Sequence, residues 1–118
     1  FDALERQIAA LEAAGVPRGA ILADPGIGFG KTQDHNLALL ARISLFHMLG
    51  APLLLGVSRK KFIGTIGQAP DPTERAAGSI AVALAGLSQG VQMIRVHDVR
   101  ATRQAVALWH AAYFGSVL

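Results

Sequence analysis

Apolar positions along the chain follow two spacings, one typical of helices and one typical of buried strands. Leu4, Ile8 and Leu11 recur at helical intervals, and a glycine and a proline at positions 15 and 17 end this first helix. Two continuously apolar runs and one alternating run are typical of strands, and they cover residues 21–23, 53–57 and 93–97. The pattern therefore predicts one helix followed by three strand–helix units.

The helices of these units carry start and stop signals. Thr32 or Asp34 is placed to cap a second helix that ends near Gly50. Asp71 is followed by a proline and, three residues after the cap, by a glutamate, which predicts a helix start, and Gln89 marks its end. We expect the small side chains of this helix to pack closely on the sheet; they are Ala77, Ser79, Ala81, Ala83 and Ala85. A last helix is expected after the third strand.

Regular alternation of strands and helices indicates parallel strands joined by crossover helices. A doubly wound sheet and a (β/α)₈ barrel both fit this order, but a whole barrel takes about 250 residues. With 118 residues the chain would hold only part of a barrel, because three strands cannot close one. The chain also opens on Phe1, already within the first helical pattern, so we expect it to be a fragment.

Composition narrows the classes of function. The net charge of +3 is a mild excess and the few aromatic residues are scattered, a pattern that argues against a nucleic-acid partner. The absence of cysteine excludes disulfides, thiol catalysis and cysteine-ligated zinc, and it fits a reducing cytoplasm. The most apolar window, residues 76–94, is interrupted by polar side chains and predicts no membrane span.

The glycine-rich stretch DPGIGFGKT, residues 24–32, is similar to a phosphate-binding loop but does not match one. A Walker A motif would need glycine where Pro25 stands, and the spacing of Gly26, Gly28 and Gly30 does not match the dinucleotide-binding fingerprint. These glycines allow backbone to approach a ligand closely, although a merely mobile loop would look the same. The ligand has to be deduced from other parts of the chain.

Polar residues at the carboxyl ends of the strands are the candidates for function, because ligands bind there in both parallel architectures. They place one carboxylate among several cations: Asp24 and Lys31 after the first strand, Ser58, Arg59, Lys60 and Lys61 after the second, and Arg95 and His97 in the third. Asp24 has two interpretations. It is either a turn residue in Asp-Pro-Gly or a buried carboxylate that accepts two N–H groups of a heterocycle.

Arg95 and His97 lie two apart on the predicted strand, so both side chains project from one face. A cation pair there needs an anion to offset its desolvation, and guanidinium with imidazole suits a phosphate or pyrophosphate. If the strand ends earlier, both residues are simply solvated. Lys60 and Lys61 cannot both face the interior, so one of them faces solvent or a second anionic ligand. The remaining histidines are expected in surface or packing roles; they are His35, His47 and His110.

Three segments in this order resemble dihydropteroate synthase of folate biosynthesis: DPGIGFGK at 24–31, GVSRKKFIG at 56–64 and RVHDV at 95–99. The resemblance extends from residue 21 to the last helix. It implies that residues 1–118 are the C-terminal segment of one pterin-binding domain. That segment would supply the last three strands and the last four helices of an incomplete (β/α)₈ barrel.

The resemblance also implies a transferase reaction. In this family the amine of p-aminobenzoate displaces pyrophosphate from 6-hydroxymethyl-7,8-dihydropterin pyrophosphate to give dihydropteroate, with Mg²⁺ assisting. No histidine–carboxylate cluster in this segment has metal-site spacing, so the Mg²⁺ ligand is expected in an N-terminal part that the segment lacks. The full-length enzyme is expected to be a cytoplasmic homodimer and a sulfonamide target, and the segment alone is expected to be inactive.

The same resemblance implies roles for individual residues. The pterin would be held by Asp24, Gly28, Lys60 and Arg95, the pyrophosphate by Arg95 and His97, and p-aminobenzoate by Phe29 and Lys61. Lys60, Arg95 and His97 would carry the catalysis. Many family members have serine where Lys61 stands, and a lysine there would either pair with the p-aminobenzoate carboxylate or point outward.

Two other hypotheses stay open. One is a methyltransferase domain that uses a methylated folate, which the Ser-Arg-Lys and Arg-Val-His segments argue against. The other is a non-catalytic barrel half that serves as a binding or dimerisation module. Its contact surface would be the alanine-rich helix at 73–88, although ordinary barrel packing explains that helix equally well.

Overall fold

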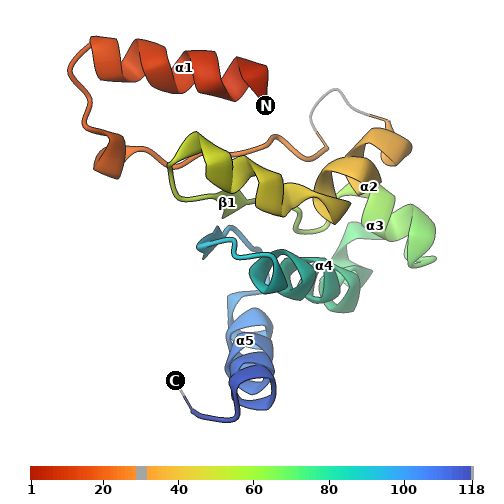
Figure 1. Cartoon of the computed structure of the whole chain (residues 1–118). Coiled ribbons are helices and arrows are strands. Elements are labelled where there is room, and N and C mark those ends of the chain that lie inside the picture. Colours follow the sequence, from red (N-terminus) through yellow and green to blue (C-terminus); the bar gives the residue numbers. More distant parts are fainter. Residues whose placement is uncertain (29–31, 118) are drawn as a thin grey trace.

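Two short parallel strands lie at the centre of the computed structural model, which describes residues 1–28 and 32–117 (Figure 1). Strand β1 (Leu54–Leu55) pairs with β2 (Met93–Ile94), with Leu54 opposite Met93. On the other side of β1, Ala23 forms a parallel bridge with Leu53. The three predicted strand positions therefore lie side by side in parallel.

The first of these positions is not a regular strand, contrary to the prediction. Ala23 donates its N–H to the Pro52 carbonyl and accepts the N–H of Leu54, each over 2.8 Å, and the ladder stops there. The pairing is confined because a 3₁₀ turn, η1 (Arg18–Ala20), precedes this run and the Asp-Pro-Gly turn follows it. The parallel α/β arrangement that alternation indicates is confirmed, while the predicted number of strands is not.

Five α-helices occur in the described residues, one more than predicted: α1 (Asp2–Ala13), α2 (Gln33–Ala41), α3 (Lys61–Ile66), α4 (Ala76–Ser88) and α5 (Val99–Phe114). The unpredicted one is α3, a six-residue helix with glycine and β-branched residues, which have low helix propensity. It buries Phe62 and Ile63, so tertiary packing rather than local preference forms it. Among the described residues no helix is both long and apolar enough to cross a membrane.

The helix cap predicted at Thr32 is confirmed, whereas Asp71 caps a 3₁₀ turn and not the α-helix predicted to start there, because α4 begins at Ala76. The Thr32 side chain accepts the N–H of His35 at the start of α2, and the helix gives way to the 3₁₀ segment η2 (Ile43–Leu49) before Gly50. Asp71 caps the 3₁₀ turn η3 (Pro72–Glu74), which leads into α4. Local side-chain to backbone hydrogen bonds of this kind are readable from sequence because they need no tertiary partner.

Helix α4 packs directly against β1, as its small residues predict, but only along part of its surface. A Cβ atom on Gly86 would lie 2.4 Å from Cδ2 of Leu55, so glycine permits the close approach. Ser79 and Ala83 are buried. The prediction is wrong for the other small residues of this stripe, which are exposed: Ala77, Ala81 and Ala85.

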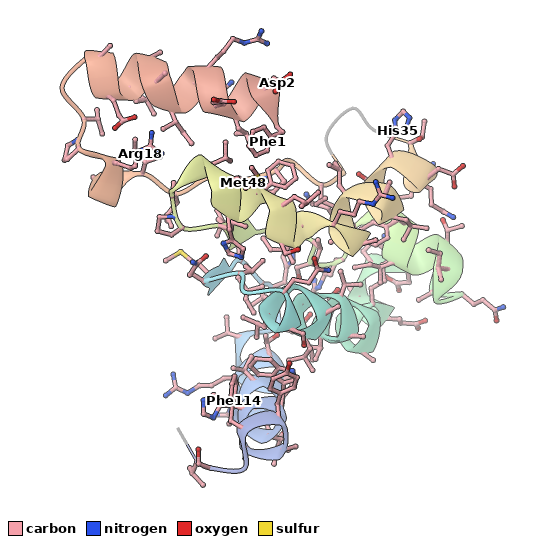
Figure 2. The ribbon with its side chains drawn as sticks, in the orientation of Figure 1. Phe1, Asp2, Arg18, His35, Met48 and Phe114 are labelled. Atoms are coloured by element: carbon pink, nitrogen blue, oxygen red, sulfur yellow. The ribbon has the colours of Figure 1, made fainter. Side chains whose placement is uncertain are left out.

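The core lies between η2, the strands and α4, and α1 and α5 extend from opposite ends of it (Figure 1). Its most completely buried side chains are Ile27, Ile43, Leu53, Leu55 and Val57. Helix α1 joins this core through Ile8, and Phe1, labelled at the start of the helix in Figure 2, adds an aromatic contact. Its ring lies 5.9 Å from the ring of Phe46. The carboxyl ends of the strands, where the candidate residues lie, border this core.

Candidate active site

A pocket of about 190 Å³ opens at the carboxyl ends of β1 and β2. It is lined by Gly56, Ser58, Lys60, Arg95, Val96 and His97. These residues come from the two segments that directly follow the paired strands, so parallel pairing brings together side chains that are about 40 residues apart in sequence. Three of the residues predicted for the site meet here, namely Lys60, Arg95 and His97.

Arg95 follows the end of β2 and lies flat against the backbone of the neighbouring strand segment. The backbone N–H of Arg95 donates to the Leu55 carbonyl over 3.0 Å. A Cβ on Gly56 would come within 2.6 Å of Nη2 of Arg95. Glycine at position 56 therefore makes room for the guanidinium. Nη2 of Arg95 lies 3.8 Å from Oδ2 of Asp24, which brings the carboxylate of the first strand end to the same site.

His97 is held by Ser58 through two contacts. Its N–H donates to the Ser58 hydroxyl oxygen over 3.0 Å, and the same oxygen lies 2.8 Å from Nδ1 of the ring. The hydroxyl also has a proton of its own, and in the neutral tautomer that receives this proton at Nδ1 the ring is protonated at Nε2. This tautomer presents an N–H donor to a bound anion.

Arg95 and His97 line one pocket, but Val96 between them lines it too, so their meeting is not the one-face alternation of a strand that was predicted. The strand ends at Ile94, earlier than predicted, and both side chains are exposed. The alternative stated for this pair, an earlier strand end with both residues solvated, thus gives the correct end of the third strand. It does not separate the two side chains, because the contact with Ser58 keeps His97 beside Arg95.

Only one of the two adjacent lysines reaches this pocket, as predicted. Lys60 is half-buried and its Nζ donates to the Ile27 carbonyl. Gly28 has a left-handed φ of 87°, and a Cβ there would lie 2.7 Å from Cδ of Lys60. Lys61 is exposed and borders a separate hollow with Asn36 and other residues. The structure therefore does not bring Lys61 together with Arg95 and His97.

The described start of the loop after the first strand position, residues 24–28, is held by two hydrogen bonds. Oδ1 of Asp24 accepts the N–H of Gly26 over 2.8 Å, so the turn interpretation of Asp24 is correct for one oxygen, while Oδ2 faces Arg95. Gly28 donates its N–H to Oδ1 of the buried Asn36 over 2.8 Å. Sequence reasoning missed Asn36, since an asparagine on α2 carries no signal of burial. Phe29, predicted for the p-aminobenzoate site, and Lys31 lie outside the described residues.

A second pair of residues joins the same two segments and was not predicted. Nη2 of Arg59 lies 2.9 Å from Oδ1 of Asp98, and this hydrogen bond is the main cause that lowers the pKa of Asp98. The same contact raises the pKa of Arg59. The available sequence signal was the position of Asp98, directly after His97 and at the start of a helix.

The described part of the chain offers little to a metal ion. Residues 1–28 and 32–117 contain no group of three or more histidine, aspartate or glutamate side chains close enough to share one. His47 contacts the Gln89 carbonyl through Nε2 at 3.0 Å, and His110 packs on Phe114, in keeping with the predicted packing roles.

Comparison with known proteins shows the family of this chain. The family model described as "Pterin binding enzyme" matches residues 2–97. The chain belongs to the pterin-binding enzyme family. It is 47% identical over 105 residues to dihydropteroate synthase of Escherichia coli (strain K12), covering 89% of this chain and 37% of that protein. The resemblance inferred from the three motifs is thereby confirmed.

Solved structures give the same result for this member of the pterin-binding enzyme family. Dihydropteroate synthase from Thermus thermophilus in complex with 4-aminobenzoate superposes with a TM-score of 0.89 at 47% identity, covering 93% of this chain and 44% of that one. The Stenotrophomonas maltophilia enzyme with active-site-bound imidazole gives 0.92 at 42% identity, covering 95% and 42%. The chain therefore spans less than half the length of these relatives.

Proposed function

We propose that residues 1–118 form the C-terminal part of a dihydropteroate synthase and that the strand-end pocket is one side of its active site. The observation that carries the proposal is the convergence of one carboxylate with three cationic or imidazole side chains at adjacent strand ends: Asp24, Lys60, Arg95 and His97. The parallel strands and their connecting helices support a barrel segment whose two open sheet edges meet the remaining strands.

Arg95 and His97 bind the pyrophosphate of the pterin substrate in this proposal. The guanidinium presents parallel N–H donors that match phosphate oxygens, and Nε2 of His97 is a donor in the tautomer that accepts the Ser58 proton at Nδ1. Both side chains are exposed within the segment, so an incoming anion reaches them without displacing core residues. Their charge stabilises pyrophosphate most strongly as it departs, when its own negative charge grows.

Asp24 and Lys60 orient the pterin ring. The carboxylate accepts N–H groups from the pyrimidine edge of the heterocycle, a two-point contact that fixes the ring plane. Lys60 donates to the carbonyl side of the ring. Its packing on Gly28 supports this role, because the glycine lets the lysine stem lie close to the loop that carries Asp24.

Bond breaking and bond making then take place at the pterin methylene. The C–O bond to pyrophosphate breaks and its electron pair leaves with the pyrophosphate, while the electron-rich pterin stabilises the positive carbon. The neutral arylamine of p-aminobenzoate forms the new C–N bond and afterwards releases a proton. No general base is required to activate the amine, since an aniline is uncharged at pH 7.

The p-aminobenzoate site, the metal and the assembly complete the proposal. Lys61 borders a hollow of about 260 Å³ beside α2, and there its ammonium is available to a carboxylate. Phe29 is proposed as a wall of the same site. We propose that any Mg²⁺ is held by residues outside this segment, and that the full enzyme is a cytoplasmic homodimer.

The test is a chimera in which residues 1–118 replace the matching part of the Thermus thermophilus enzyme, to which they are 47% identical. We expect it to form dihydropteroate from the pterin pyrophosphate and p-aminobenzoate, and to lose turnover on Lys60→Ala. An active chimera that is indifferent to both Lys60→Ala and Arg95→Ala would exclude the proposed site. Methyl transfer from a methylated folate, assayed in parallel, would favour the methyltransferase alternative instead.

A further inference from the structure

The segments that follow β1 and β2 are joined by two contacts, of which only one lies in the pocket. Ser58 binds His97 at the pocket wall. Next to it in sequence, Arg59 forms a two-point contact with Asp98: Nη2 to Oδ1 over 2.9 Å and Nε to Oδ2 over 3.3 Å. Arg59 therefore directs its side chain away from the pocket that its neighbours line.

The backbone at Arg59 is in a conformation that residues other than glycine seldom adopt. Its φ is 58°, in the left-handed region. Two partners near the start of α4 hold it there: the N–H of Arg59 donates to Oγ of Ser79 over 2.8 Å, and its carbonyl accepts Nη1 of Arg75 over 2.9 Å. This left-handed turn lies between Ser58 and Lys60, so it sets how both enter the pocket.

Asp98, the other member of the ion pair, is fixed at the start of α5. It is the N-cap residue of α5, and its carbonyl accepts both the N–H and the Oγ1 of Thr102, over 3.0 and 2.7 Å. Thr102 is buried. The Arg59–Asp98 ion pair thus connects a fixed turn in front of α3 to a fixed helix start, and the residues next to its two members, Lys60 and His97, line the pocket.

We propose that Arg59 and Asp98 are positioning residues, and that their ion pair sets the separation of Lys60 and His97 without contacting the substrate. The inference rests on the proposed function, because it assumes that these two groups act on one ligand. The competing explanation is that Arg59 itself binds pyrophosphate. The two differ in what Asp98 should do: a positioning pair fails when either member is removed, whereas a direct ligand does not need its partner.

A double-mutant cycle in the Thermus thermophilus chimera separates these explanations. The variants are Arg59→Ala, Asp98→Ala and the two combined, and the measurement is kcat/KM for the pterin pyrophosphate. We expect each single change to lower it by up to about 100-fold, the cost of a misplacement of roughly 1 Å, and the double variant to be no worse than the poorer single one. Additive losses, or a harmless Asp98→Ala beside a severe Arg59→Ala, would overturn the proposal.

Two controls distinguish positioning from folding. Arg59→Gly removes the ion pair but favours the left-handed backbone, so it should lose as much activity as Arg59→Ala while keeping a higher melting temperature. A second control replaces a carboxylate by an amide at a remote ion pair, that of Arg18 and Glu12. Glu12→Gln, the counterpart of Asp98→Asn, should leave kcat/KM unchanged. Restored activity in Arg59→Gly would refute a role for the side chain.

A readout without turnover keeps this inference separate from the proposed function. The ring nitrogens of His97, observed by NMR in the chimera, report the Nδ1 contact with Ser58 whatever reaction the protein performs. We expect Asp98→Asn to shift these resonances and to weaken the binding of inorganic pyrophosphate by calorimetry, and Glu12→Gln to do neither. A chimera that makes no dihydropteroate but shows these changes would contradict the proposed reaction alone. Unchanged His97 resonances in Asp98→Asn would contradict the positioning role.

Discussion

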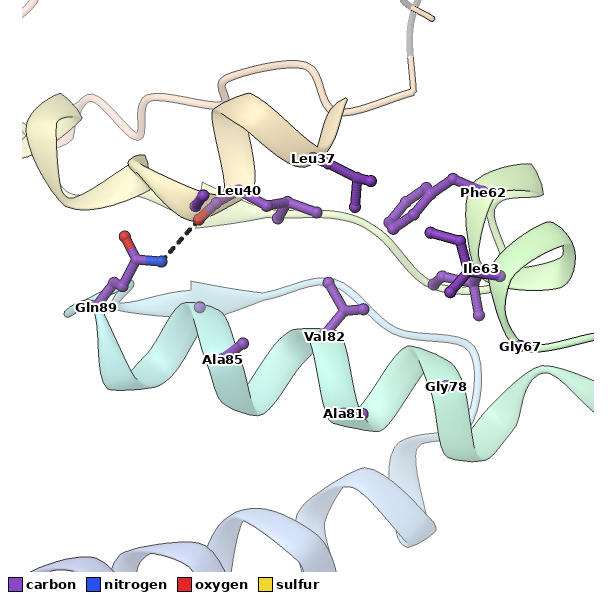
Figure 3. A pocket seen from close by; sticks show the side chains of 13 residues that line it. Leu37, Leu40, Phe62, Ile63, Gly67, Gly78, Ala81, Val82, Ala85 and Gln89 are labelled. Atoms are coloured by element: carbon purple, nitrogen blue, oxygen red, sulfur yellow. Dashed lines mark hydrogen bonds between the residues drawn. The ribbon is translucent and has the colours of Figure 1, made fainter. Parts of the chain in front are cut away.

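Two hollows in the molecule differ in size and in chemistry, and the smaller one carries the candidate function. A groove of about 490 Å³ runs between α2, α3 and α4 (Figure 3). Gln89 has the only polar side chain on its described walls, and its Nε2 is bound to the Leu40 carbonyl over 2.7 Å. The strand-end pocket is less than half as large, at about 190 Å³, yet four of its six lining residues have polar side chains.

The comparison shows why volume alone does not locate a reactive site. The groove presents small and branched apolar side chains such as Ala81 and Ile66, which can exclude water but cannot orient a polar ligand or stabilise developing charge. The pocket brings donors from two strand ends to one place because parallel strands align their carboxyl ends. Convergence of polar groups, rather than space, is the property to test.

The largest expected effect is at Arg95, and it tests the comparison most directly. In the chimera, Arg95→Ala should lower kcat by about 10²- to 10³-fold, because one donor aimed at developing charge is worth that much. Ile66→Ala, in the groove, is the matched change and should leave kcat within about twofold, since exposed substitutions usually have small effects. Steady-state kinetics of both variants decides the matter, and the reverse ranking would make the groove the functional site.

A smaller loss is expected at Asp24, where turn and ligand roles coexist. Asp24→Asn keeps Oδ1 as the acceptor for Gly26 but removes the charge that faces Arg95 and that is proposed to hold the pterin. We expect kcat/KM for the pterin pyrophosphate to fall by about 10- to 100-fold, the worth of hydrogen bonds to a charged group. Asp24→Ala should add a loss of melting temperature, because it also removes the turn contact. Unchanged kinetics in Asp24→Asn would mean that Asp24 stabilises the turn and does not bind the substrate.

Much of this arrangement was predictable from sequence where the cause is local. The caps at Thr32 and Asp71 follow from side chains that bond to nearby backbone, and the parallel direction of the strands follows from alternation. The meeting of Arg95 with Lys60 followed from their positions at strand ends. The roles of these residues remain predictions, as does that of Phe29, which lies outside the described residues.

The features that sequence did not reveal depend on tertiary partners. Helix α3 forms around the burial of Phe62 and Ile63, whereas its local propensity is low. The pair of Arg59 and Asp98 spans 39 residues, and neither residue signals its partner. Asn36 is similar, because its contact with the glycine loop exists only after α2 packs beneath that loop. The pairing of polar groups that are distant in sequence is thus the part of the site that could not be predicted from the sequence.

Gly28 offers a test of the pocket's backbone, with a loss expected in stability as well as activity. Gly28→Ala introduces a Cβ at a φ of 87° and 2.7 Å from Cδ of Lys60. The left-handed conformation alone should cost about 1–2 kcal/mol of unfolding free energy, and the displaced lysine should raise KM for the pterin. Gly19→Ala is the matched control, because nothing lies within 4 Å of its Cβ and its φ is ordinary. Urea denaturation of the chimera should therefore separate the two variants.

The smallest effects concern acid sensitivity, and they compare Asp71, which caps the 3₁₀ turn ahead of α4, with Asp98, which lies beside the pocket. Hydrogen bonds from Thr73 lower the pKa of Asp71 on the helix side, and the hydrogen bond from Arg59 lowers that of Asp98 beside the pocket. A carboxyl whose pKa is lower folded than unfolded binds fewer protons in the native state, so its stabilisation is complete above the ordinary value of 3.8. The stabilisation is lost as the pH falls below that value and through the native pKa.

We therefore expect the urea concentration at the unfolding midpoint of the chimera to decrease when the pH is lowered below about 4. In each Asp→Asn variant this decrease should be smaller. Asp71→Asn retains an oxygen for the N–H of Thr73, so its midpoint at pH 7 should change little. Asp98→Asn should reduce the loss of stability at low pH in the same way. It should in addition alter activity, because its partner Arg59 lies next to Lys60. If both variants affected acid stability but neither affected turnover, the pocket side would be no more functional than the helix side.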